Sequence, residues 1–153
     1  MRHFADKREV LFGGQDLLVQ LFSDAIRSAP PAATTAACLA AALEAAAVAF
    51  TPERHDLAPQ RRAVIAAHSE LQERELLKRA RRASALAAAL RARGAGDVAA
   101  SLAGKVGVLA FSAAYARWAA PENSQPFAEI ARAALRELQA SATTLGAETG
   151  VRA

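Results

Sequence analysis

The stretch Asp97–Ala120 reads DVAASLAGKVGVLAFSAAYARWAA; it contains no proline, and its only charged residues are Asp97, Lys105 and Arg117. Two apolar stripes follow it with the three- and four-residue spacing of a helix, about 100° apart around the axis. The first stripe is Val108, Phe111, Tyr115 and Trp118, and the second stripe is Leu102, Val106, Leu109, Ala113 and Ala116. A helix that is apolar over so wide an arc is expected to be buried on more than one side. One side would face its own domain, and the other a cavity ligand or a second chain; a plain central core helix is the alternative.

The remainder of the 153-residue chain shows the same helical periodicity. Alternating β-branched runs joined by hairpin turns, which indicate strands, are missing from the sequence. We therefore predict an all-α helical bundle, a single domain large enough to bury a core. The body is expected over residues 13–141, followed by a flexible tail over 142–153. The main expected helices are Gln15–Ser28, Ala32–Phe50, Pro59–His68, Ser69–Arg93, Asp97–Ala120 and a last one beginning near Pro126.

Composition indicates the cellular compartment of the protein and the kinds of partner it could bind. The net charge of +4 is a mild basic excess, compatible with binding a polyanion. The single cysteine, Cys38, excludes an internal disulfide and is typical of a reducing compartment, so we expect a cytoplasmic protein. No signal peptide opens the chain, and no uncharged apolar run reaches the ~18 residues of a membrane span. We expect no membrane association.

Motifs that would indicate catalysis or a metal site are missing from the sequence. It contains no Gly-rich phosphate loop, no CxxC pair and no HExxH motif. None of His3, His55 and His68 has a second ligand three or four residues away within one predicted helix. Ser101 and Ser112 lie among alanines without a neighbouring base. We therefore expect no metal, no cofactor and no enzymatic activity.

The helix Ser69–Arg93 has the clearest boundaries. Ser69 and Gln72 have the spacing of a capping box, and Gly94 is a typical residue to end a helix. Its buried line is predicted to be Leu76, Ala80, Ala83, Ala87 and Leu90. The basic run Lys78, Arg79, Arg81 and Arg82 is expected to be a solvated face.

The alanine-rich helices favour a mainly apolar pocket for a small apolar ligand. Small side chains leave volume unfilled, and the interiors of helical bundles are common ligand sites. The tyrosine hydroxyl could supply one directional hydrogen bond. The alternative is a closely packed core with no cavity. The predicted lining residues are Phe22, Leu43, Phe50, Leu76, Ala83, Phe111 and Tyr115.

We also predict a homodimer built on the last two helices, from the second apolar stripe of Asp97–Ala120 together with the apolar face of Phe127–Leu138. Helix pairs from two chains would form a four-helix bundle with a two-fold interface. Trp118 and Phe127 are expected to contribute most, because large aromatic side chains dominate such patches. The predicted interface residues are Val108, Trp118, Phe127, Ile130, Ala134 and Leu138.

Residues 2–11 read RHFADKREVL, with Asp6 and Glu9 spaced as a capping box. This segment resembles the junction between the recognition helix and the following helix in TetR-family transcriptional repressors. A long helix opening with HSEL at residues 68–71 resembles the branch with a mycofactocin-regulator-like C-terminal domain, as does a penultimate helix ending in Arg117-Trp118. The resemblance implies a ligand-binding and dimerisation domain that regulates transcription.

The resemblance also implies contacts with DNA. His3 and Lys7 match positions that contact DNA phosphates in the family, and a lysine beside a free helix N-terminus suits an anion. Residues 1–12 are then a remnant of a helix-turn-helix domain, and DNA binding requires the missing reading head to be restored. The alternative is a stand-alone dimeric helical module that binds an apolar ligand and never contacts DNA. An in-frame helix-turn-helix upstream of the Met1 codon would favour the regulator, and stop codons there would favour the module.

Overall fold

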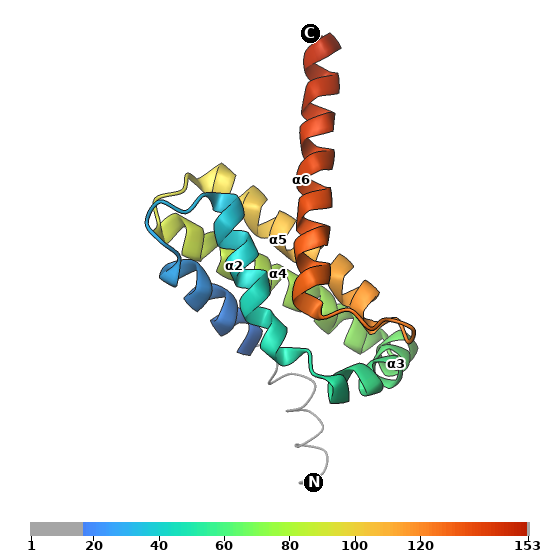
Figure 1. Ribbon diagram of the computed structural model, residues 1–153. Coiled ribbons are helices and arrows are strands. Elements are labelled where there is room, and N and C mark those ends of the chain that lie inside the picture. The colour runs from blue at the N-terminus through green and yellow to red at the C-terminus, as the bar shows by residue number, and fades with distance from the viewer. Residues whose placement is uncertain (1–16, 153) are drawn as a thin grey trace.

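The computed structural model describes residues 17–152, with side chains as far as residue 147. Every regular element in this part of the chain is a helix, which confirms the all-α prediction (Figure 1). A first helix covers residues 17–28. It is followed by α2 (Thr35–Ala46) with the short 3-10 helix η1 (Ala47–Ala49), α3 (Pro52–Ala67), α4 (Ser69–Ala92), α5 (Asp97–Ala119) and α6 (Phe127–Arg152).

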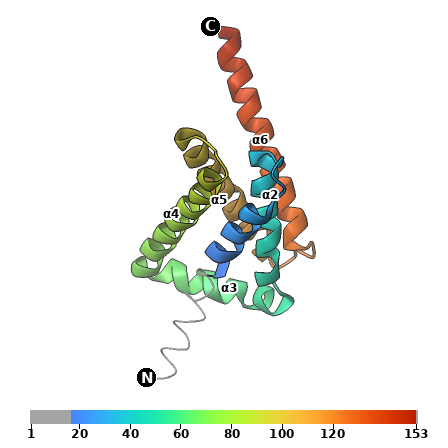
Figure 2. The same ribbon diagram turned by 90° about the vertical axis from the view of Figure 1, so that its left-hand side faces the viewer.

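The helix α5 lies at the centre of the fold, as its wide apolar arc predicted. It packs most extensively against α4 and α6 and also contacts α2 and α3 (Figure 2). Ala100, Ala110 and Ala114 are completely buried in it, and Phe111 and Trp118 nearly so. Helix α5 is also long enough, and over an 18-residue window apolar enough, to suit a membrane span. The core helix of a water-soluble protein passes the same test, so this property alone identifies no membrane segment.

Two glycines of α5 allow α4 to approach closely. A Cβ atom at Gly104 would overlap the backbone carbonyl oxygen of Ala83 in α4. A Cβ atom at Gly107 would lie 2.9 Å from Leu86 Cδ1 and 3.1 Å from Leu39 Cδ2, which is tighter than ordinary van der Waals contact. The α4–α5 crossing therefore depends on the absence of side chains at these two positions.

Side-chain caps and turn residues fix several helix ends. The Thr34 hydroxyl accepts a hydrogen bond from the Ala37 amide at the start of α2, and the Thr51 hydroxyl accepts one from the Arg54 amide at the start of α3. Gly94 has φ of +104° directly after α4, which agrees with its prediction as a helix stop.

The structure corrects the predicted start of α3 and the predicted cap of α4. Helix α3 begins at Pro52 instead of Pro59, because Thr51 caps it and a proline is favoured at the first helical position. Pro59 lies inside the helix, although a proline has no backbone N–H to donate there. Helix α4 begins at Ser69, but His68 is its N-cap and no side chain caps it. The Gln72 amide donates to the carbonyls of Ile65 and Ala66 instead of closing the predicted capping box.

Arg93 joins the end of α4 to the end of the first helix. Its guanidinium donates hydrogen bonds to the carbonyl oxygens of Ile26 (3.2 Å), Ala29 (2.9 Å) and Pro30 (2.6 Å). The Ile26 and Pro30 carbonyls also accept hydrogen bonds from the Ala29 and Ala33 amides, so Arg93 adds a second donor to these two and a side-chain donor to the Ala29 carbonyl. The first helix is thereby attached to α4 at one end.

The last helix is longer than predicted. The segment predicted as a flexible tail from residue 142 is helical, since α6 continues to Arg152 and projects beyond the other helices (Figure 1). The segment contains no proline, and the hydroxyls of Thr143 and Thr144 donate to backbone carbonyls one turn earlier. Closer to the body, ion pairs join Arg132 to Glu44 of α2 and Glu137 to Arg117 of α5.

Candidate ligand-binding site

An aromatic cluster fills the interior between the first helix, α5 and α6. Phe50 lies at its centre, stacked on Phe127 with ring centroids 4.0 Å apart and edge-on to Trp118 at 5.0 Å. Phe111 contacts Phe50 at 5.7 Å, and Phe22 of the first helix meets Phe111 edge-on at 5.6 Å. Such tilted and edge-to-face pairs add to the stabilisation from burial alone. The cluster links segments that are far apart in the sequence.

The structure brings together most of the predicted pocket residues. Phe22, Phe50, Phe111 and Tyr115 belong to or border the aromatic cluster. Leu43 is buried in the same core, and Ala83 is partly buried against it. The prediction that Leu76 lines the pocket is wrong, because this residue of α4 is 62% exposed to solvent.

The inward face of α4 differs from the predicted one. Its first half turns Leu71, Glu75, Lys78 and Arg82 toward the interior, whereas Ala80 is exposed together with Leu76. Lys78 is only 3% exposed and Arg82 only 8%. The prediction of a solvated basic face is therefore wrong for these two cations and right for Arg79 and Arg81. The predicted burial of Ala87 and Leu90 in the second half is confirmed.

A pattern in the sequence could have revealed this polar line. Leu71, Glu75, Lys78, Arg82 and Leu86 follow one another at spacings of four, three, four and four residues, which is one face of a helix. Counting only apolar residues hides it, because three of the five positions are charged.

Glu75 is the centre of an ion-pair network between α3 and α4. Its Oε1 accepts hydrogen bonds from Lys78 Nζ (2.7 Å) and from Arg61 Nη2 (2.8 Å). Burial alone would raise the pKa of Glu75, but the hydrogen bond from Lys78 and the charges of Arg61, Lys78 and Arg82 outweigh burial, so the pKa is lowered. Burial lowers the pKa of Lys78, which the hydrogen bond to Glu75 partly offsets. Arg61 also donates to the Tyr115 hydroxyl at 3.4 Å, so this network reaches α5.

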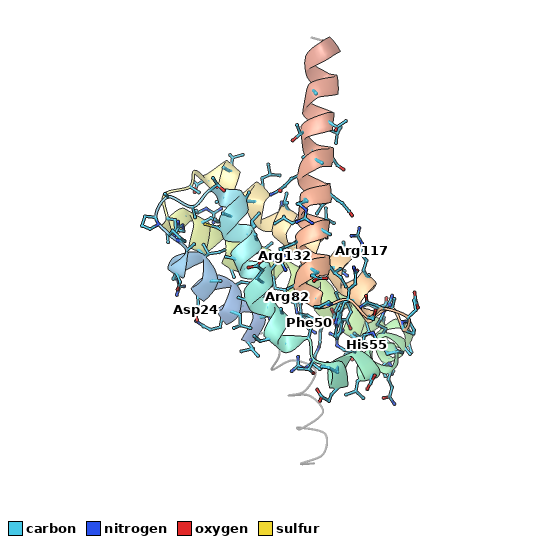
Figure 3. All side chains as sticks on the ribbon, viewed as in Figure 1. Asp24, Phe50, His55, Arg82, Arg117 and Arg132 are labelled. Carbon is cyan, nitrogen blue, oxygen red and sulfur yellow. The ribbon has the colours of Figure 1, made fainter. Side chains whose placement is uncertain are left out.

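Arg82 lies beside this network without joining it. Its guanidinium carbon is 5.0 Å from the centroid of the Phe111 ring, a cation–π contact. Its Nε is enclosed and has no hydrogen-bond partner among the described residues. Burial lowers the pKa of Arg82, and the nearby charge of Glu75 acts in the opposite direction. Figure 3 shows Arg82 and Phe50 in the middle of the molecule, with His55 on α3.

The described histidines have structural partners. The His55 ring hydrogen-bonds the Ala120 carbonyl at 3.1 Å and packs edge-on against Trp118. The His68 Nδ1 hydrogen-bonds the Val64 carbonyl at 2.8 Å. Within the described part of the chain, no three histidine, cysteine or acidic side chains are grouped so that they could hold a metal ion.

The predicted dimer residues are largely unavailable for contact with a second chain. Val108, Trp118, Phe127, Ile130 and Ala134 are buried within the single chain, and Leu138 packs against the same core. The prediction that these residues form the interface is contradicted by their burial, because the first stripe of α5 and the facing side of α6 surround the aromatic cluster.

The second stripe of α5 faces outward instead. Leu102 is 63% exposed and Leu109 56% exposed, Ala116 is exposed, and Val106 and Ala113 are half-buried. Val98 lies on the same side one turn earlier and is also exposed. The surface of α5 that could receive a second chain is thus the second stripe, which motivated the dimer prediction, and it lies about 100° around the helix from the predicted interface residues Val108 and Trp118.

The predicted DNA-phosphate contacts His3 and Lys7 lie outside the described residues. Comparison with known proteins adds no family assignment: no protein-family model matches the chain, and no curated protein matches its sequence.

Proposed function

We propose that this chain is the regulatory domain of a TetR-like transcriptional regulator, which dimerises and binds a small, mainly apolar effector. The observation that carries the proposal is the division of α5 between two environments. One side carries Phe111 and Trp118 into the aromatic cluster, and the other exposes Leu102 and Leu109. The role is binding and not catalysis.

The interior supports the effector half of the proposal. Aromatic rings from the first helix, α5 and α6 meet there, with the α3–α4 polar network at their edge. Phe22 contacts Phe111 from the first helix, so an effector that repositions Phe111 also acts on that helix. In a regulator of this kind, movement of the N-terminal helices is the output, and Phe22 is the contact that would transmit it.

The outward stripe supports the dimer half. Val98, Leu102 and Leu109 follow one side of α5, and exposed apolar side chains aligned on one surface are typical of an interaction site. Lys105 interrupts the stripe, and its long side chain can lie along an apolar surface while its charge remains in water. Two copies meeting through this side of α5 would bury it in an isologous interface.

Sedimentation velocity tests the dimer directly. We expect the parent protein to sediment as a dimer and the double variant Leu102→Glu/Leu109→Glu as a monomer, since like charges would face each other across the two-fold axis. Leu77→Glu, an exposed leucine on α4, is the matched control and should remain dimeric. A parent protein that is monomeric at micromolar concentration would contradict the proposal.

A stand-alone dimeric effector-binding module would use the same two sides of α5. Sequencing the DNA upstream of the Met1 codon separates the two roles. An in-frame helix-turn-helix supports the regulator, and in-frame stop codons support the module.

A further inference from the structure

We infer that the effector is an amphipathic carboxylate, such as a medium-chain or aryl carboxylic acid, whose carboxylate is bound by Arg82. This inference rests on the proposed effector-binding role of the interior. It starts from one unusual group, a guanidinium with 8% exposure that forms no hydrogen bond or ion pair with any described residue.

A buried charge without a hydrogen-bonded partner is costly, and the Phe111 ring offsets only part of that cost. Native proteins pair nearly all such groups, so an orphaned nitrogen at Nε indicates a partner supplied from outside. An anion at this point would supply the missing acceptors. The remaining exposure of the side chain means that the site is not sealed from solvent.

The nearby carboxylate of Glu75 does not serve as that partner. Its Oε1 already accepts from Arg61 and Lys78, at 2.8 and 2.7 Å. Those hydrogen bonds hold Glu75 toward α3, so its charge stabilises Arg82 only at a distance. The cation of Arg82 is therefore left for a ligand.

The surroundings of Arg82 select the class of anion. A planar guanidinium matches a planar carboxylate through two parallel N–H···O bonds. The face of Phe111 lies against the same guanidinium, and Phe22 and Phe50 lie against Phe111. Such a site suits a molecule with one charged end and an apolar body, and it suits inorganic phosphate poorly because phosphate has no apolar body to place on the rings.

Octanoate, its neutral analogue octanamide and inorganic phosphate are the probes for the test. The readout is the Nε–H resonance of Arg82 in nitrogen-15 NMR, assigned as the signal that disappears in Arg82→Met. We expect octanoate to shift this resonance and to bind at least about tenfold more tightly than octanamide, which cannot form a charge-assisted pair. Arg82→Met should remove that preference, whereas Arg81→Met, an exposed neighbour, should retain it.

Arg82→Met should fold, because it replaces an unpaired buried charge with an unbranched apolar side chain that reaches as far as the Nε position, and its melting temperature should not fall below that of the parent. The parent comparison of octanoate with octanamide needs no variant, so it stands whatever the stability of Arg82→Met. Equal affinity for both probes, tighter binding of phosphate than of octanoate, or an Arg82 signal that no probe shifts would each overturn the inference. Sedimentation of the parent protein is measured separately. A failure of the carboxylate inference therefore does not affect the dimer result, and the two failures can be distinguished.

Discussion

The two halves of α4 pack against the same neighbour and differ in every other respect. The C-terminal half places Ala83 and Leu86 against α5 at a crossing where Gly104 and Gly107 leave no room for a side chain, and it buries Leu90. The N-terminal half turns charged side chains inward, toward α3 and the aromatic cluster. The C-terminal half contributes stability through close apolar packing, and the N-terminal half holds charged groups whose burial costs free energy. This division is what is expected when one end of a helix anchors the fold and the other end forms a site.

The largest effect is expected where the close crossing is broken. Gly104→Ala places a methyl group against the Ala83 carbonyl, and because backbone yields less readily than a side-chain end, we expect a loss of about 2–3 kcal/mol in the free energy of unfolding. Gly146→Ala is the matched control: its Cβ meets nothing within 4 Å, and alanine in a helix should add up to about 1 kcal/mol. Urea unfolding measures both. A Gly104→Ala protein as stable as the parent would show that the crossing is not tightly packed.

A smaller loss is expected at the attachment of the first helix. Arg93→Met removes three hydrogen bonds to the carbonyls of residues 26, 29 and 30, and we expect about 1.5 kcal/mol of lost stability with faster amide exchange over 17–28. Arg91→Met loses an exposed ion pair with Asp97 and should cost about 0.5 kcal/mol or less. Equal losses in the two variants would mean that Arg93 does not hold the first helix.

The smallest effect concerns the polar half and depends on pH. The folded-state pKa of Glu75 lies below its ordinary value of 4.5, so the unfolded chain binds more protons in acid. The contribution of Glu75 is therefore present above that ordinary pKa and is lost as the pH falls through the folded-state value. Glu75→Gln should flatten the acid limb of the stability curve by less than about 1 kcal/mol. Glu70→Gln, exposed on the same helix, is the control; identical curves for Glu75→Gln and the parent would contradict the network.

The sequence patterns predicted the fold better than they predicted the residues of the site. Helical periodicity predicted the all-α class, the central position of α5 and the stop at Gly94, because these depend on local spacing and backbone conformation. The inward turn of Lys78 and Arg82 depends on contacts with Arg61 and Phe111, which lie on other helices. Which of the two α5 stripes is buried likewise depends on which helices pack against α5. Periodicity identified both stripes and could not tell which of them faces inward.

Hydrogen exchange compares the two halves of α4 most directly. If the N-terminal half forms a ligand site, it lacks close apolar packing, so amides of residues 72–82 should exchange at least about tenfold faster than those of residues 86–92 in the free protein. Adding octanoate should slow exchange in the first set and leave the second set unchanged. Equal exchange rates in the two sets, with no response of either to octanoate, would contradict the assignment of the polar half as a binding site.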